Sequence, residues 1–337
     1  MENERPGNRK QNNWIYVVLS VVFAVAVISG GVFSGSMLYD VIAAEEKASP
    51  VSEPSMEEAA AADTTGSGSA AAENAAGENQ PQPVETDGEG ETVYPEITQE
   101  PNLPEQKPYD GETFRVVCIG NSVTQHPYSA QGVDPLGYWL QDWGMAASAR
   151  EKDYAHVLEQ KMASIYGETS LEVYNYNAWE NAEAAGIPRR NLLPDLDPLF
   201  EGEKGEDTDL VIIQLGESCT MFDNLMQDFI DLIYYIHDHA PNAAIGVTGT
   251  VIIMDEARTA AVDNIKQMIC QSMSLPYISM SGYNESMWVG EGTVIYNEQG
   301  EATVISFVQR THPGDAGMQY IADQIYTVVA PYLPVVG

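Results

Sequence analysis

The stretch that decides the fold is Phe114-Arg-Val-Val-Cys-Ile-Gly-Asn-Ser-Val-Thr124. Its first six residues are apolar apart from Arg115, which is typical of a buried strand. The glycine that follows permits a sharp turn, and such a turn would present the Ser122 hydroxyl to solvent. We therefore expect a strand and a serine-bearing turn near the start of a folded domain that covers residues 112–337.

Apolar runs and helical periodicity alternate through the rest of that domain. Strands are predicted at 114–119, 171–176, 210–215, 243–248 and 276–280. Helices are predicted at 153–166, 225–237, 255–273 and 315–329, and a hairpin at 294–305. This alternation predicts an α/β domain with a mostly parallel sheet covered on both faces.

An uncharged apolar run of residues 14–38 precedes the domain and is long enough to span a bilayer. Basic residues precede it at Arg5, Arg9 and Lys10, and the first charged residues that follow it are acidic, at Asp40, Glu45 and Glu46. By the positive-inside rule, residues 1–13 are expected in the cytoplasm and everything after the helix outside. The alternative interpretation is a cleaved signal peptide.

Residues 39–111 are rich in Ala, Glu, Gly, Ser and Pro and poor in large apolar side chains. Such a segment cannot bury enough apolar surface to offset its chain entropy. We expect a disordered, acidic linker that tethers the domain, with an acidic binding tail as the alternative.

The whole chain of 337 residues carries 15 basic and 50 acidic residues, for a net charge of -35. A polyanion needs a basic face, so nucleic acid is not an expected partner. The cysteines Cys118, Cys219 and Cys270 lie far apart, with no CxxC or Cys/His cluster that would hold zinc. No nucleotide fingerprint or HExxH motif occurs, and therefore no cofactor or metal is expected.

Three segments follow predicted strands or enter the last helix, where α/β sheets place their sites. They are 119–123 with Ser122, 214–218 with Ser218, and 311–318 with His312. A serine hydroxyl becomes nucleophilic at neutral pH when an imidazole accepts its proton. The order of these segments in an α/β pattern therefore predicts Ser122 as nucleophile and His312 as base.

These segments resemble the SGNH (GDSL-like) hydrolases over nearly the whole domain. VVCIGNSVT resembles their first block, VIIQLGES lies where the third is expected, and THPGDAGMQYIADQI resembles the last. The resemblance implies the SGNH fold, a flavodoxin-like three-layer αβα sandwich. It also implies hydrolysis of an ester, often an acyl group on a sugar.

The sequence departs from the family at its acid and at its oxyanion donors. The Asp three residues before the family's histidine is Gln309 here, which would orient His312 without supplying charge. Asp315 is a second candidate acid, although capping of the last helix is its more ordinary role. The third-block Asn is Ser218, whose hydroxyl can donate a hydrogen bond.

The remaining oxyanion donors are expected to be backbone N–H groups. The resemblance assigns one to Ser122 itself. No second-block glycine is evident, and so the N–H of Ala178 or Trp179 is expected to serve. For substrate binding we predict Asn121 beside the nucleophile and Trp139, Trp143 and Trp179 stacked on sugar rings, against ordinary packing of these indoles as the alternative.

Together these features predict a bacterial, single-pass membrane protein with an extracellular serine esterase domain. Its expected substrate is an acylated carbohydrate, a cell-surface glycan or a small ester, from which an acyl-enzyme would take an acetyl or other short acyl group. Two alternatives keep the fold: a catalytically degenerate glycan-binding module, and an acyltransferase with the same Ser–His pair. A third moves the nucleophile to Ser218, in a segment that resembles the G-x-S-x-G turn of α/β-hydrolases.

Overall fold

The computed structural model describes residues 108–129, 137–220, 222–252 and 255–336. The predicted transmembrane helix at 14–38 and the linker up to residue 107 lie outside these residues. Within the described residues, no helix has both the length and the apolar character needed to cross a membrane.

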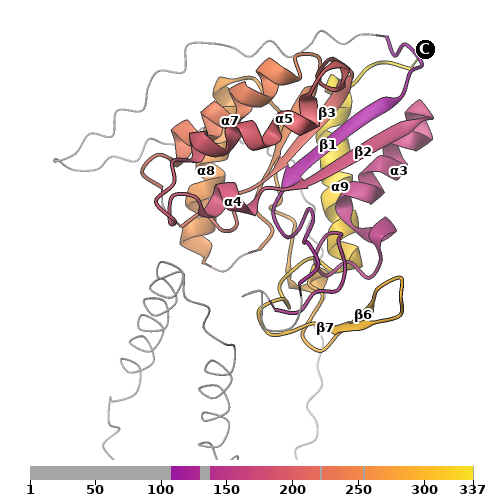
Figure 1. Ribbon diagram of the computed structural model, residues 1–337, viewed down its shortest axis with the longest axis vertical. Helices are drawn as coiled ribbons and strands as arrows, with labels where there is room; N and C mark the ends of the chain where they lie inside the picture. The colour runs from indigo at the N-terminus through magenta and orange to yellow at the C-terminus, as the bar shows by residue number, and fades with distance from the viewer. Residues whose placement is uncertain (1–107, 130–136, 221, 253–254, 337) are drawn as a thin grey trace, which may run out of the picture. The chain divides into compact units, whose positions relative to one another are not determined.

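A five-stranded parallel sheet forms the centre of the domain, in the order β2-β1-β3-β4-β5 (Figure 1). The strands are β1 Phe114–Gly120, β2 Thr169–Asn175, β3 Thr208–Gln214, β4 Ala244–Thr248 and β5 Tyr277–Ile278. The chain runs outward from β1 to β2 and then returns to the other side of β1 with β3. The carboxyl end of β1 is therefore the point at which the strand order reverses, where open α/β sheets place ligands.

Side chains of β1 alternate between the two faces of the sheet because successive residues of a strand point in opposite directions. Phe114, Val116 and Cys118 join the core beneath one layer of helices, while Val117 and Ile119 join the core beneath the other. All seven residues of the strand are buried. This explains why the sequence of β1 is a nearly continuous apolar run.

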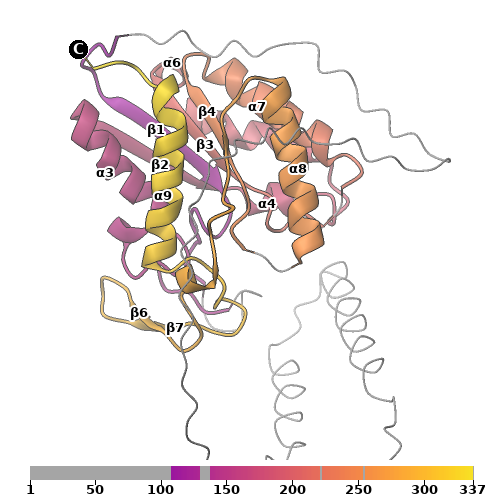
Figure 2. The same ribbon diagram turned by 180° about the vertical axis from the view of Figure 1, so that it is seen from behind.

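Helices cover both faces, as the two opposite views show (Figures 1 and 2). One layer consists of α3 Tyr154–Tyr166 and α9 Asp315–Val329. The other consists of α4 Asn177–Asn181, α5 Asp197–Phe200, α7 Leu225–His239 and α8 Glu256–Ser272. The predicted α/β architecture with a parallel sheet between two helical layers is confirmed.

Differences from the sequence-based elements are confined to short pieces. The short helix α4, the turns of 3-10 helix at Arg189–Leu196 and the helix α6 Glu203–Glu206 were not predicted, because they are too short to show helical periodicity. The predicted hairpin is present as β6 Val294–Tyr296 and β7 Ala302–Val304. Its turn contains Gly300 with φ of +81°, a conformation that glycine adopts without strain.

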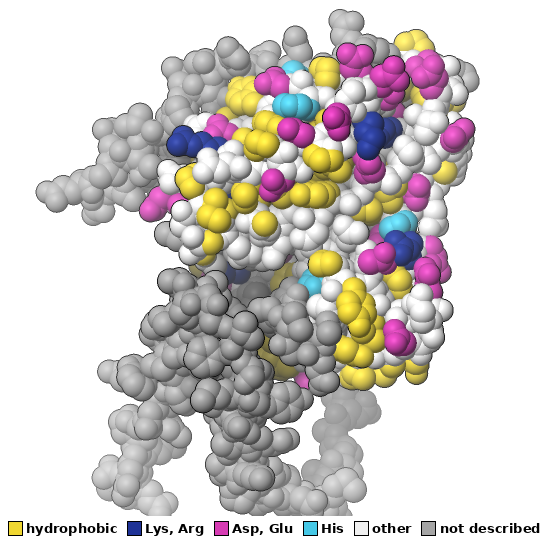
Figure 3. Space-filling model, in the orientation of Figure 1, with side chains coloured by type: hydrophobic (Ala, Val, Ile, Leu, Met, Phe, Trp, Pro, Cys, Tyr) yellow, Lys and Arg dark blue, Asp and Glu magenta, His cyan; other side chains and the backbone are white. Residues whose placement is uncertain are grey.

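Acidic side chains are scattered over the face seen in Figure 3, whereas Lys and Arg side chains appear at only a few places. The distribution matches the excess of acidic over basic residues in the sequence. Apolar groups on this face lie in small areas among polar ones, as is usual for a soluble domain.

Candidate active site

Ser122 lies in a tight turn directly after β1. Gly120 is required there, because a Cβ at this position would lie 1.9 Å from Thr124 Oγ1 and 2.7 Å from the carbonyl oxygen of Gln214. The N–H of Thr124 donates to the carbonyl of Asn121 at 3.0 Å, which closes the turn. The N–H of Tyr176 donates to the Gly120 carbonyl at 2.6 Å and fixes the end of β2 against it.

The structure brings Ser122 and His312 together, although 190 residues separate them in the chain. Ser122 Oγ and His312 Nε2 are 3.0 Å apart, within hydrogen-bond distance, and both residues are buried. His312 Nδ1 lies 3.1 Å from the main-chain carbonyl oxygen of Gln309. A carbonyl can only accept, so Nδ1 carries the proton and Nε2 is free to accept from the Ser122 hydroxyl.

The predicted role of the Gln309 side chain is wrong, because the main chain of that residue performs it. Gln309 Oε1 accepts from the N–H and hydroxyl of Ser306, at 2.9 and 3.0 Å, and Nε2 donates to the Tyr138 carbonyl at 3.1 Å. The side chain therefore ties the loop before His312 to the segment around Tyr138. Only its main-chain carbonyl orients the imidazole.

Asp315 also lies away from His312. Its carboxylate accepts from the N–H and hydroxyl of Ser148 and from the Lys152 ammonium, all at 2.7–2.8 Å. These donors hold its pKa below the usual value. The N-cap of α9 is Gly314, so the expected capping role is also wrong. Among the described residues, no carboxylate hydrogen-bonds His312.

The environment of His312 makes it a weak, uncharged base. Burial lowers the pKa of the imidazole to about 4, partly offset by the bond to the Gln309 carbonyl and reinforced by the nearby His126. At neutral pH the ring is therefore unprotonated, as a general base must be. The carbonyl supplies no negative charge to stabilise the imidazolium that forms when Ser122 attacks.

Among the turn, loop and cap hydrogen bonds of the described residues, none has the N–H of Ser122 or of Ala178 as its donor. Ala178 lies in the first turn of α4, where N–H groups have no acceptor inside the helix. The alternative donor, the N–H of Trp179, is bound to the Tyr176 carbonyl at 2.9 Å. Of the two predicted residues, Ala178 therefore has the available donor.

The Ser218 hydroxyl lies close enough to the carboxylate of Glu180 to lower the pKa of that group. A serine hydroxyl has one proton to donate, and the carboxylate competes for it with a developing oxyanion. Gly216, two residues earlier, has φ of +132°, and a Cβ there would lie 2.7 Å from Val262, which makes glycine necessary in this loop.

The predicted substrate-binding residues are buried. Trp139 and Trp179 have no exposed surface and Trp143 has 4%, so none offers an indole face to a sugar. Trp139 and Trp143 pack edge to face with centroids 6.3 Å apart, and Trp179 packs against Phe229 in the same way. Their role is core packing. Asn121, 2% exposed, faces inward and not toward a ligand.

Sequence reasoning missed two residues of this region, Glu180 and Glu217. Both carboxyl groups are buried and both hydrogen-bond the Asn121 side chain. The pKa of Glu180 is raised to about 7, first by burial and then by the charge of Glu217. The signal that points to Glu217 is its place in the third-block segment, between Gly216 and Ser218. Nothing in the sequence distinguishes Glu180 from an ordinary exposed helical glutamate.

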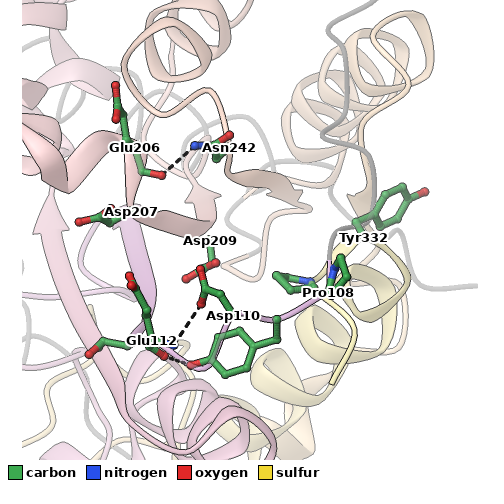
Figure 4. A pocket seen from close by; sticks show the side chains of 11 residues that line it. Pro108, Asp110, Glu112, Glu206, Asp207, Asp209, Asn242 and Tyr332 are labelled. Atoms are coloured by element: carbon green, nitrogen blue, oxygen red, sulfur yellow. Dashed lines mark hydrogen bonds between the residues drawn. The ribbon is translucent and has the colours of Figure 1, made fainter. Parts of the chain in front are cut away.

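A pocket at the other end of the sheet contains more carboxylates but no comparable chemistry (Figure 4). It lies by the starts of β1 and β3, and its lining includes Asp110, Glu112, Glu206, Asp207 and Asp209. The lining contains no Ser, Cys, His, Lys or Arg. Ser122 and His312 are absent from its lining, and so this pocket is not the site predicted from the sequence.

The geometry around Ser122 is suited to acyl transfer. It holds a hydroxyl within hydrogen-bond distance of a neutral imidazole and a carbonyl that fixes the tautomer. These are the parts that nucleophilic attack on an ester carbonyl requires. Among the described residues there is no group of three or more His, Cys, Asp or Glu side chains that would hold a metal ion.

No family model and no curated protein matches the chain. Solved structures similar to it include TesA, with 14% identity and a TM-score of 0.38 over 65% of this chain and 99% of TesA. A family two carbohydrate esterase from Clostridium thermocellum has 14% identity and a TM-score of 0.42, over 67% of this chain and 64% of its own.

A two-domain esterase active on acetylated mannans is also similar, with 14% identity and a TM-score of 0.42. The matched region covers 68% of this chain and 53% of that esterase. The chain thus spans only part of both carbohydrate esterases. Such distant likenesses assign no activity, and the function has to be argued from the residues of the site.

Proposed function

We propose that this protein is a serine esterase that removes acetyl or other short acyl groups through an acyl-enzyme on Ser122. The observation that carries the proposal is the 3.0 Å contact between Ser122 Oγ and His312 Nε2, together with the Nδ1 contact that fixes the tautomer. A buried serine and a buried histidine from opposite ends of the domain have no structural need to meet in this way. The sequence resemblance to SGNH hydrolases supports the same assignment.

In the first half of the reaction, Ser122 Oγ attacks the ester carbonyl while His312 Nε2 takes its proton. The N–H groups of Ser122 and Ala178 stabilise the negative oxygen of the tetrahedral intermediate. The alcohol leaves with the proton returned by His312, and an acyl group remains on Ser122. Water activated by His312 then releases the acid. Without a carboxylate behind His312, we expect a slow enzyme that acts on activated or acetyl esters.

The proposed natural substrate is an acylated carbohydrate or a cell-surface glycan, as in many members of the family that the sequence resembles. The apolar run at 14–38 and the cluster of basic residues directly before it support an extracellular domain anchored in a bacterial membrane. Protease added to intact cells should release the domain by cleavage in the segment 39–111. Protection of the domain until the membrane is broken would contradict this orientation.

The proposal is tested by labelling the protein with a fluorophosphonate probe and by measuring hydrolysis of 4-nitrophenyl acetate. We expect labelling of the wild type at Ser122 and none in Ser122→Ala. Ser218→Ala serves as the matched control, since the alternative nucleophile predicts the opposite pattern. A wild-type protein that neither reacts with the probe nor hydrolyses acetyl esters would overturn the proposed function.

A further inference from the structure

Two acidic side chains lie buried directly beside the turn that carries Ser122. Glu180 is 1% exposed and belongs to α4, while Glu217 is 6% exposed and follows β3. Buried carboxyl groups are costly unless they are hydrogen-bonded or paired. Neither group contacts Ser122 or His312, and so the reaction as described above does not explain them.

Both carboxyl groups meet at the Asn121 amide. Asn121 Nδ2 donates to Glu217 Oε2 at 2.7 Å and to Glu180 at 3.2 Å from Oε1 and 3.4 Å from Oε2. Asn121 Oδ1 accepts from the Val123 N–H at 3.0 Å. Glu180 and Glu217 therefore hold the Asn121 side chain, and Asn121 in turn holds the main chain of Val123 on the other side of Ser122.

The two carboxyl groups also bind the segments that follow neighbouring strands, Glu180 through an oxygen that it shares with Asn121 and Glu217 through its other oxygen. Glu180 Oε1 accepts from the Gly216 N–H. Glu217 Oε1 accepts from Gln214 Nε2 at 2.8 Å and from the Val251 N–H at 3.0 Å. Through this network, the segments that follow β1, β2 and β3 are tied to one another at a single point beneath Ser122.

Positive side chains near this point form ion pairs with other carboxylates, Arg189 with Glu183 and Asp228 and Lys266 with Asp263, and leave the carboxylate oxygens of the pair to neutral donors. Arg189 donates to the main-chain carbonyls of Trp179 and Glu180, at 3.0 and 3.3 Å. Lys266 donates to the carbonyls of Leu215 and Thr248, and Arg258 to that of Glu217. The two carboxyl groups thus depend on N–H and O–H donors, of which the Asn121 amide is the one they share.

We propose that Glu180 and Glu217 are positioning residues, which hold the Ser122 turn through Asn121 and thereby require Asn at position 121. This inference rests on the proposed role of Ser122. In the family that the sequence resembles, Asp and Asn alternate before the nucleophile. Here an Asp at 121 would present a third acceptor to two carboxyl groups. It would lose both bonds and add like-charge repulsion.

The test reverses the hydrogen bond between Asn121 and Glu217, the two partners that lie closest together at 2.7 Å. In Glu217→Gln, the oxygen that accepts from Gln214 and Val251 is kept, but an amide donor then faces the Asn121 donor. In Asn121→Asp, an acceptor faces an acceptor. The double variant Asn121→Asp/Glu217→Gln restores one donor and one acceptor with the direction of the bond reversed.

We expect each single variant to lower kcat about 30-fold or more with KM changed less than about threefold, because the turn moves while the substrate pocket stays. The double variant should be faster than either single variant, which is the coupling expected of a direct contact, but should stay about tenfold below the wild type because the bond to Glu180 remains lost. Glu206→Gln, at the other end of the sheet, is the matched control and should keep wild-type rates. Rates of phosphonate labelling at Ser122 should follow kcat, and thermal unfolding should show which variants are folded.

Folded single variants with wild-type rates would overturn the positioning role, and so would a double variant no faster than the slower single one. If the single variants do not fold, Glu180→Gln gives the second test, because Gln keeps an acceptor for the Gly216 N–H. It should remain folded and lower kcat about tenfold with KM preserved, and an unchanged kcat would overturn the proposal. A wild type that is neither labelled nor active would contradict both the proposed function and this inference. An active wild type with variants that keep wild-type rates would contradict this inference alone.

Discussion

Carboxylate side chains cluster at both ends of the central sheet, but their burial and their hydrogen bonding differ between the two ends. At the carboxyl ends of the strands, Glu180 and Glu217 are buried and every bond they accept comes from a defined donor. At the amino ends, acidic side chains line an open pocket that contains no basic residue or nucleophile (Figure 4). A cluster of acidic side chains therefore indicates a functional site only when hydrogen bonds hold the carboxyl groups in place beside a reactive side chain.

Asp209 and Glu180 sharpen this contrast, because burial raises the pKa of both. The pKa of Asp209 rises to about 6 and that of Glu180 to about 7. Asp209 accepts one bond, from the Arg115 N–H at 2.8 Å, at the beginning of the sheet. Glu180 joins the loops around Ser122. A raised pKa alone therefore does not separate a structural acid from one that serves the site.

The largest expected effect tests which end of the sheet carries the chemistry. Ser122→Ala and His312→Ala should each lower kcat by about a thousandfold or more, since they remove the proposed nucleophile and the proposed base. Asp209→Asn should keep kcat/KM within about twofold. Hydrolysis of 4-nitrophenyl acetate measures all three. Loss of activity in Asp209→Asn alone would reverse the assignment of the two ends.

A second effect concerns stability beneath the site. Trp179 is fully buried against Phe229, with the Arg189 guanidinium 5.2 Å from its ring centroid. Trp179→Ala should lower the free energy of unfolding by about 3–5 kcal/mol through the cavity it leaves, whereas Tyr128→Ala, at an exposed aromatic, should change it by less than about 0.5 kcal/mol. Denaturant unfolding measures both. A stable Trp179→Ala with weakened glycan binding would restore the sugar-stacking role predicted from the sequence.

The dependence of stability on pH should reveal the buried groups at the carboxyl ends. The pKa of Glu180 is raised, so the folded state binds more protons than the unfolded state between about pH 4.5 and 7, and its contribution to stability is lost as pH rises. The pKa of His312 is lowered to about 4, so its contribution is lost as pH falls below about 6.5. The two trends oppose each other in this window.

Removing one of the two groups should therefore expose the other. Glu180→Gln should lose more stability than the wild type on acidification from about pH 7 to pH 4.5, because the Glu180 contribution no longer offsets the His312 trend. Urea unfolding at a series of pH values measures the difference. Equal pH slopes in the two proteins would show that Glu180 is ionised throughout, contrary to its burial beside Glu217.

The smallest effect is expected at Gln309. Gln309→Ala keeps the main-chain carbonyl that orients His312, so kcat should fall less than about tenfold. Gln309→Asp should not raise kcat/KM, because the side chain points toward Ser306 and Tyr138. A rise of about tenfold or more in Gln309→Asp would show that the loop can turn this side chain to the imidazole, and would favour the role inferred from the sequence.

Much of the fold was readable from local patterns. Burial of β1 on both faces produces its continuous apolar run, and burial of one face of α9 produces its amphipathic periodicity, so both elements can be predicted from the sequence. Ser122 and His312 were recognisable because their motifs lie where strands end and a helix begins. The short helix α4 carries too few residues for any period, and it was missed together with Glu180.

The sequence by itself determined the alternation of strands and helices. It also identified Ser122 and His312 as candidates, because both lie in recognisable motifs. What only the tertiary structure decided was direction: that Gln309 turns its side chain away and offers its carbonyl, that Asn121 donates to the buried carboxyl groups of Glu180 and Glu217, and that three tryptophans face the core. Composition and spacing constrain where a residue stands along the chain. The hydrogen bond that a polar side chain makes depends on which partner the fold brings within about 3 Å, and that partner can lie anywhere in the sequence.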